Sequence, residues 1–263
     1  VNNNGIGVSG VAGGTGNGDG VKVMTLQIFG GLFENSFIYA ADNGAVISQN
    51  SWGYSNPYYF DQSVKEAIDY FVAEAGDFAG SPMKGGLVIF AAGNNNFDSE
   101  WYPGYFSNVM AVAAIGPEWK KASYSNFGNW VEISATGGDQ ETYNAKSGVL
   151  STVTKDQYAY LQGTSMACPH MSGIAALALA NRNKQLTNTE LWNKLVTGVV
   201  NIDEYNPDYI GQLGSGAVDA SLAIQNDLGI APSAITDLDV TGIAQEFATL
   251  AWTVPSDNDD MKP

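Results

Sequence analysis

The chain has 263 residues, and its 44% hydrophobic and 14% charged residues are typical of a globular protein with room for one large core. Its formal net charge is −16, from 11 Lys and Arg against 27 Asp and Glu. This balance argues against nucleic acid and anionic membranes as partners, because both require a basic surface. No apolar run reaches the roughly 18 residues of a membrane span. The single Cys168 excludes a disulfide within the chain and a cysteine-based metal cluster.

Apolar runs alternate with amphipathic segments along the first half of the chain. The predicted buried strands are 21–29, 45–50, 87–92 and 109–115. A first helix is predicted at 36–42, and a second begins at a capping box of Ser63 and Glu66. The apolar face of this second helix consists of Val64, Ile68, Phe71 and Val72.

This alternation predicts an α/β fold with a doubly wound, mostly parallel sheet that helices cover on both faces. Ligands of such sheets bind beyond the carboxyl ends of the strands. Asn50-Ser51-Trp52-Gly53 and Gly93-Asn94 follow two predicted strands at that edge. The glycine-rich stretch 13–20 matches no phosphate-binding motif and is interpreted as a solvated turn.

Composition changes after Gly229, so we divide the chain into a main domain, 1–229, and a tail, 230–263. Ala231-Pro232-Ser233 is typical of a linker. Two strands are predicted after it, at 235–240 and 248–254. Two strands alone are only marginally stable.

The most informative stretch runs from Gly163 to Gly173 and places Ser165 just before a helix of small residues. The positive end of a helix dipole favours a developing negative charge there. Nucleophilic catalysis by serine needs an activated hydroxyl, a base and donors for the oxyanion. Asn94, at the end of a predicted strand, offers an amide donor, although asparagine at such a position is also typical of a turn. The only histidine, His170, lies five residues past Ser165, and we do not expect it to be the base.

The stretch from Gly163 to Gly173 resembles the nucleophile motif of the subtilisin-like serine proteases, and Ala91-Ala92-Gly93-Asn94 resembles their oxyanion motif. The resemblance extends over almost all of residues 1–230. It implies a subtilisin-like fold and a serine endopeptidase, with Ser165 as the nucleophile and Asn94 as the oxyanion ligand. No cofactor is then required for the chemistry.

The same resemblance implies a set of residues that bind an extended peptide or protein substrate. Ser51-Trp52-Gly53 is similar to the family segment that pairs with the substrate backbone and reaches the P1 pocket, and Gly30-Gly31 is similar to the second pairing edge. Gly93 and Thr164 belong to the same implied site. Trp101, before a Tyr102-Pro103 turn that is often cis in the family, stands where relatives have a small residue. Trp52 fits a core aromatic residue as well as a pocket wall.

The first eight residues resemble the family loop in which an asparagine and backbone carbonyls bind calcium. Asn4 is therefore the candidate ligand of a structural calcium ion, and a simple polar turn explains the loop equally well. In the family this loop follows the catalytic histidine, and the catalytic aspartate lies further upstream. Neither motif is present in these 263 residues.

We therefore expect an N-terminally truncated protease domain that is inactive by itself, because the Asp and His are absent. The expected partners are a substrate, the missing N-terminal segment and an inhibitory propeptide. The resemblance also implies secretion or a cell-surface or periplasmic location, and the tail resembles the start of a fibronectin type III domain. Two alternatives stay open: a peptide-binding pseudoprotease, and a two-chain enzyme whose N-terminal piece binds non-covalently.

Overall fold

A computed structural model describes residues 2–31, 33–182, 184–225, 237–243 and 248–251 of the chain. The chain divides into two compact units, Val1–Ile224 and Gln225–Pro263. The described helices are α1 (Phe33–Asp42), α2 (Gln62–Glu74), α3 (Thr164–Ala180), α4 (Asn188–Thr197) and α5 (Ala220–Ala223), with 3-10 turns at Pro117–Trp119, Asp203–Tyr205 and Pro207–Tyr209. The described strands are β1 (Ile47–Asn50), β2 (Met83–Lys84), β3 (Leu87–Ala91), β4 (Met110–Ile115), β5 (Ile133–Thr136), β6 (Val149–Val153), β7 (Gln157–Leu161), β8 (Leu186–Thr187), β9 (Val199–Val200), β10 (Ala217–Val218), β11 (Asp239–Ile243) and β12 (Ala248–Ala251).

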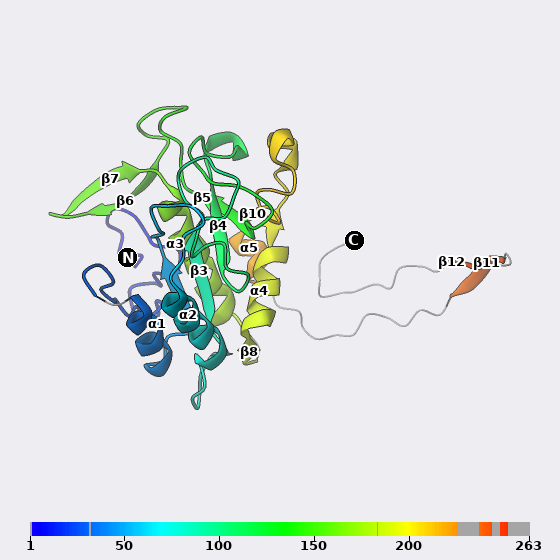
Figure 1. The fold of residues 1–263 in the computed structure, drawn as a ribbon, viewed down its shortest axis with the longest axis horizontal. Coiled ribbons are helices and arrows are strands. Elements are labelled where there is room, and N and C mark those ends of the chain that lie inside the picture. Colours follow the sequence, from blue (N-terminus) through cyan, green and yellow to red (C-terminus); the bar gives the residue numbers. More distant parts are fainter. Residues whose placement is uncertain (1, 32, 183, 226–236, 244–247, 252–263) are drawn as a thin grey trace. The chain divides into compact units, whose positions relative to one another are not determined.

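The centre of the first unit is a six-stranded sheet with the order β1-β3-β4-β5-β10-β9 (Figure 1). Every neighbouring pair from β1 to β10 is parallel, and only β9 runs antiparallel to β10. Ile47 pairs with Leu87 at the start of the β1–β3 ladder. The predicted α/β fold with a mostly parallel sheet is confirmed.

Helices cover both faces of this sheet, because side chains alternate along each strand. In β3, Leu87 and Ile89 belong to the core cluster that includes residues of α3 and α4. Val88 and Phe90 belong to the cluster on the other face, with α1 and α2. The side chains of Ile68 and Phe71, predicted on the apolar face of the second helix, are fully buried there. Two layers of helices around one sheet follow directly from this alternation.

The start of α2 differs from the prediction. Its N-cap is Asp61, whose carboxylate accepts the Ser63 N–H at 2.9 Å and the Ser63 hydroxyl at 2.8 Å. Ser63 therefore lies inside the helix, and the predicted capping box with Glu66 is wrong. The structure uses the stronger cap two residues earlier, since a charged acceptor at the positive helix end is favoured.

The predicted strand 21–29 is also wrong, because the described residues of this segment form no strand. Val21, Val23 and Phe29 are 52%, 80% and 69% exposed. A strand requires a neighbour for its backbone N–H and C=O groups. The nearest strand in sequence, β1, pairs with β3 and with no other described strand. Residues 21–29 therefore have the apolar pattern of a strand, but no described strand pairs with them.

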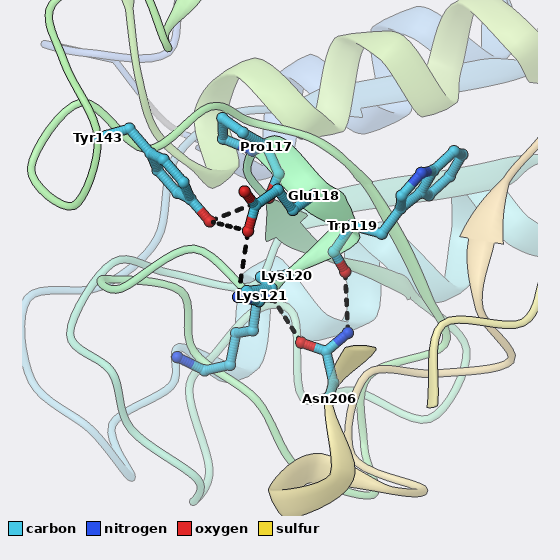
Figure 2. A network of polar contacts seen from close by, with 7 residues as sticks. All are labelled: Pro117, Glu118, Trp119, Lys120, Lys121, Tyr143 and Asn206. Atoms are coloured by element: carbon cyan, nitrogen blue, oxygen red, sulfur yellow. Dashed lines mark hydrogen bonds and ion pairs between the residues drawn. The ribbon is translucent and has the colours of Figure 1, made fainter. Parts of the chain in front are cut away.

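A turn between β4 and β5 is held by the polar contacts shown in Figure 2. The buried Asn206 accepts the Lys121 N–H through Oδ1 at 2.7 Å and donates through Nδ2 to the Trp119 carbonyl at 2.9 Å. The Tyr143 hydroxyl donates to the Pro117 carbonyl at 3.3 Å. These contacts fix the position of the segment that follows Lys121, which reaches the functional site.

In the second unit, β11 and β12 form an antiparallel pair with a register shift between Val240 and Gly242. The predicted strand 235–240 thus begins later, at Asp239, and ends later, at Ile243. Residues 235–236 and 252–254 of the two predicted strands lie outside the described residues.

Asp139, after β5, is a buried carboxylate that organises its loop. It accepts hydrogen bonds from the Ser123 N–H at 2.8 Å, the Ser123 hydroxyl at 3.1 Å and the Thr142 N–H at 3.0 Å. Burial by itself would raise the pKa of Asp139, but these hydrogen bonds outweigh burial and lower the pKa below its ordinary value of 3.8. The charged form is therefore part of the folded structure.

We expect Asp139→Asn to lower the free energy of unfolding by about 1–3 kcal/mol at pH 7, because it replaces a charged acceptor of buried donors. A lowered folded-state pKa gives stability that is full above the unfolded pKa and is lost as the pH falls through the folded pKa. The difference between the wild type and the variant should therefore shrink in acid. Urea unfolding over a pH series measures this, with the exposed Asp77→Asn as the matched control. Equal stability of the Asp139 variant and the wild type at pH 7 would contradict the assignment.

Candidate active site

Ser165 is the second residue of α3, and Gly163 is the N-cap of that helix. Gly163 has φ 145°, a backbone conformation that residues with a side chain rarely adopt, so glycine is required at this turn. The first N–H groups of a helix have no acceptor within it. Among the described residues the Ser165 N–H finds none outside it either. A free donor at the positive end of the helix therefore lies next to the Ser165 hydroxyl.

Asn94 follows the end of β3 and holds the start of α3. Its Oδ1 accepts the Thr164 N–H at 2.8 Å and the Thr164 hydroxyl at 2.8 Å. The same hydroxyl accepts the Gly93 N–H at 3.2 Å. Because a backbone N–H can only donate, the oxygen of the Asn94 amide must face Thr164, and this fixes the direction of Nδ2. Nδ2 forms no hydrogen bond within the described part of the chain and remains available as a donor.

The loop that carries Asn94 is held by Asn126, a buried residue that belongs to none of the motifs found in the sequence. Asn126 Oδ1 accepts the N–H groups of Asn95 at 2.9 Å and Phe97 at 3.1 Å, and its Nδ2 donates to the Ala92 carbonyl at 2.9 Å. One carboxamide thus satisfies backbone groups on both sides of Asn94. Its partners lie about thirty residues away in the sequence, and no local motif marks such a contact.

Asn94, Thr164 and Ser165 border a cleft with a volume of about 300 Å³. The predicted site residues in its lining are Ser51, Trp52, Gly53, Gly93, Asn94, Trp101, Thr164 and Ser165. The Ser51 hydroxyl donates to the Ser165 carbonyl at 2.9 Å, which joins the end of β1 to the first turn of α3. The structure therefore brings together residues that the sequence separates by more than a hundred positions.

Three predicted site residues are not part of this lining. Gly30 and Gly31 are exposed at the end of the segment 21–31, and Gly30 has φ 86°. Asn4 is exposed, and its Oδ1 accepts the Ile6 N–H at 3.0 Å. The described residues contain no group of three or more His, Cys, Asp or Glu side chains that could hold a metal ion.

Two tryptophans shape the cleft. Trp52 stands in the lining and also packs against Phe90, with ring centroids 5.1 Å apart, so it serves as a wall and as part of the core. The Trp101 indole lies beside both Gly53 and Gly93 in the cleft lining. A Cβ atom at Gly53 would stand 3.6 Å from Trp101 Nε1, and one at Gly93 would stand 3.5 Å from Trp101 Cδ1. The next peptide bond, Tyr102-Pro103, is cis, as the resemblance implied.

His170 does not serve Ser165 in this arrangement. Its Nδ1 donates to the Met166 carbonyl at 2.8 Å, one turn back on α3, and no hydrogen bond joins it to Ser165. It is the only histidine of the chain. The described residues thus provide a hydroxyl and two N–H donors without acceptors, and no histidine in the position of a base.

A serine at the start of a helix, beside a free amide at the end of a neighbouring parallel strand, is an arrangement suited to nucleophilic catalysis by serine. Residues 1–224 match the Subtilase family, Peptidase S8. The chain therefore belongs to the subtilase family.

The relatives are proteases by name. The chain is 31% identical to the extracellular basic protease of Dichelobacter nodosus over 87% of this chain and 38% of that protein. It is 32% identical to alkaline elastase YaB of Bacillus sp. strain YaB, over 84% of this chain and 51% of that protein. A solved protease from Pseudoalteromonas arctica superimposes with a TM-score of 0.66 at 30% identity, covering 84% of this chain and 66% of that chain.

The chain thus spans 38% and 51% of the length of these two curated relatives. None of the helices in the described residues has the length and apolar character that crossing a bilayer requires.

Cys168 lies three residues past Ser165, so its thiol is a second side chain near the candidate site whose reactivity can be tested. It is fully buried, and burial raises its pKa to about 11. Since the thiolate is the reactive form, we expect iodoacetamide at pH 8 to leave Cys168 unmodified in the folded protein and to alkylate it fully in guanidinium chloride. Mass spectrometry of both samples measures this. Stoichiometric alkylation of the folded protein would show that the thiol is accessible and ionised.

Proposed function

We propose that the protein containing this chain is a serine endopeptidase that cleaves extended polypeptides, with Ser165 as the nucleophile. One observation carries the proposal. The Asn94 amide oxygen accepts hydrogen bonds from Thr164, which leaves Asn94 Nδ2 as a free donor in the cleft that contains Ser165. The Ser165 N–H, which has no acceptor among the described residues, is the second free donor. Two preorganised donors beside a hydroxyl are the arrangement that acyl transfer requires.

In the proposed reaction a base removes the proton of the Ser165 hydroxyl while Oγ attacks the substrate carbonyl carbon. The carbonyl oxygen becomes an oxyanion and accepts hydrogen bonds from the Ser165 N–H and Asn94 Nδ2. The C–N bond then breaks, and the protonated base gives its proton to the leaving amine. Water hydrolyses the acyl-enzyme by the same steps and regenerates Ser165.

We propose that the base, a histidine with its aspartate, is supplied by polypeptide outside these 263 residues. His170 is bound to the Met166 carbonyl and is the only histidine present. The edge of the sheet at β1 supports this proposal. Among the described strands β1 has a neighbour on one side only, and Val23 and Phe29 are exposed on an extended segment without a ladder partner. A strand from an N-terminal segment would satisfy such an edge.

The substrate proposal is an extended peptide whose P1 side chain enters the slot between Gly53 and Gly93. Because the Trp101 indole lies beside both glycines, we propose that it limits the depth available to the side chain. The proposed preference at P1 is for small residues, since a large side chain would collide with the indole. Gly30 and Gly31 remain our candidates for a second pairing edge, outside the cleft lining.

Calcium remains a proposal for the loop around Asn4. A calcium ion takes six to eight oxygen ligands. Asn4 Oδ1 already accepts the Ile6 N–H, and the described residues gather no acidic cluster. The described residues alone therefore do not fit a complete calcium site, and Asn4 would be one ligand of a site completed from elsewhere.

The wider context of the protein is likewise proposed. A relative is named an extracellular protease, which supports secretion of this protein. A secreted protease is commonly held inactive until maturation, and an inhibitory propeptide in the cleft is our proposed means. The antiparallel pair β11–β12 supports the proposal that the tail begins a fibronectin type III-like domain.

The decisive test uses the full-length protein with Ser165→Ala. We expect hydrolysis of a peptide substrate and labelling by a fluorophosphonate to fall to background with the fold intact, because no other group replaces the hydroxyl. The matched control is Ser172→Ala on the same helix, which removes a hydroxyl that donates to the Cys168 carbonyl at 3.0 Å. Circular dichroism checks the fold of both variants.

The same assay applied to residues 1–263 alone should show neither hydrolysis nor labelling, because a serine without a base is a weak nucleophile. Exposed apolar surface should make this piece self-associate, as light scattering would detect. Stoichiometric labelling of Ser165 in the single piece would overturn the proposed source of the base. A full-length protein that binds peptides without cleaving them would instead be a pseudoprotease.

Trp101→Gly in the full-length enzyme tests the pocket. We expect kcat/KM for P1 phenylalanine to rise by about tenfold or more relative to P1 alanine, because the indole no longer fills the slot. Trp119→Gly is a matched control, since Trp119 lies outside the cleft lining and already has φ 61°. A P1 profile that stays unchanged in Trp101→Gly would show that Trp101 only supports the fold.

A further inference from the structure

Tyr124 connects the two loops that form the site. It follows the turn of Figure 2, in the segment fixed by Lys121 and Asn206. Its carbonyl accepts the Asn96 N–H at 2.7 Å, which holds the loop that carries Asn94. Its hydroxyl accepts the Gly163 N–H at 2.8 Å, which holds the turn that leads into Ser165. One residue thus contacts the oxyanion loop with its backbone and the nucleophile turn with its side chain.

The hydroxyl of Tyr124 is fully engaged in these contacts. It lies 2.6 Å from the Gly138 carbonyl and 3.0 Å from the Gly137 carbonyl, and it donates its single proton between them. Burial raises the pKa of the Tyr124 phenol, so the proton stays in place across the pH range of a folded protein. The group therefore acts as a permanent bridge between the Gly137-Gly138 backbone and Gly163.

The start of α3 needs such external support. Its N-cap is a glycine, which offers no side chain to accept the first N–H groups, and the structure has no side-chain cap there. Glycine also restricts the backbone least of all residues. The direction of the first turn is thus set from outside, by contacts that include Asn94 on Thr164, Ser51 on the Ser165 carbonyl, and Tyr124 on Gly163.

We propose that the Tyr124 hydroxyl is a positioning residue for Ser165, fixing the nucleophile turn relative to the oxyanion loop. This inference rests on the proposed function, since it assigns a role within that site. Removing the hydroxyl leaves the Gly163 N–H with the Gly137 carbonyl, at 3.1 Å, as its remaining acceptor. The turn therefore stays formed but gains freedom, and small displacements of a nucleophile reduce turnover strongly.

The test compares Tyr124→Phe with Tyr143→Phe in the full-length enzyme. Both changes remove one hydroxyl that contacts a backbone carbonyl, and Tyr143 contacts Pro117 outside the cleft lining (Figure 2). For Tyr124→Phe we expect kcat to fall about tenfold or more with KM within about twofold. The midpoint of the pH profile should not move, because the base itself is unchanged. Tyr143→Phe should keep kcat within about twofold.

Hydrogen exchange of the backbone amides gives a readout that does not depend on activity. Tyr124→Phe should speed exchange at Gly163 and Thr164 while leaving the core strand β4 protected as in the wild type. The proposal is overturned if Tyr124→Phe keeps wild-type kcat, or if exchange at Gly163 is unchanged. A wild-type enzyme with no Ser165-dependent hydrolysis would instead contradict the proposed function, and the exchange experiment would still decide whether Tyr124 holds the turn.

Discussion

The hydrogen bonds from Thr164 to the Asn94 amide oxygen are the constraint on which the candidate site depends. They join the end of β3 to the start of α3 across 70 residues of sequence. An amide has one accepting end and one donating end, so occupying the oxygen determines where the nitrogen points. The same bonds satisfy the first N–H of the helix, which lacks a side-chain cap of its own. Orientation of the Asn94 amide, the proposed oxyanion donor, and support of the start of the helix that carries Ser165 are thus one interaction.

The core makes this junction possible by letting α3 lie close to the sheet. Ala167, Ala175 and Ala178 of α3 are fully buried in the core cluster that also contains residues of β3 and β4. Small side chains bring the helix axis near the strand ends, and close packing then resists displacement of either element. Gly93 adds a close approach at the end of β3, where it has φ 108° and a Cβ would collide with Asn126. The site is therefore rigid because of packing as well as hydrogen bonds.

The sequence predicts those parts of the molecule that have a local pattern. Hydrophobic runs predicted β1, β3 and β4, and the stretch around Ser165 and the strand end at Asn94 predicted residues that the cleft brings together. Asn126 and Tyr124 were not predicted, because their hydrogen-bond partners are backbone groups distant in sequence. Such contacts produce no characteristic residue spacing in the sequence. The prediction of a strand at 21–29 was wrong for the opposite reason. Its pattern is that of a strand, but a pattern does not specify the neighbour with which a strand must pair.

The hydrogen bonds around Asn94 and Ser165 indicate which parts of the proposed catalytic machinery this chain would supply and which would come from elsewhere. The hydrogen bonds that orient Asn94 and the start of α3 come from residues between Ser51 and Thr164, so the proposed oxyanion half of the candidate site lies within one folded unit. A base brought by a docking segment would find the nucleophile and both donors already placed, and docking would not have to pay for their ordering. Positional freedom would then be confined to the docking edge at β1. Such a junction could vary in affinity while the geometry at Ser165 stayed the same.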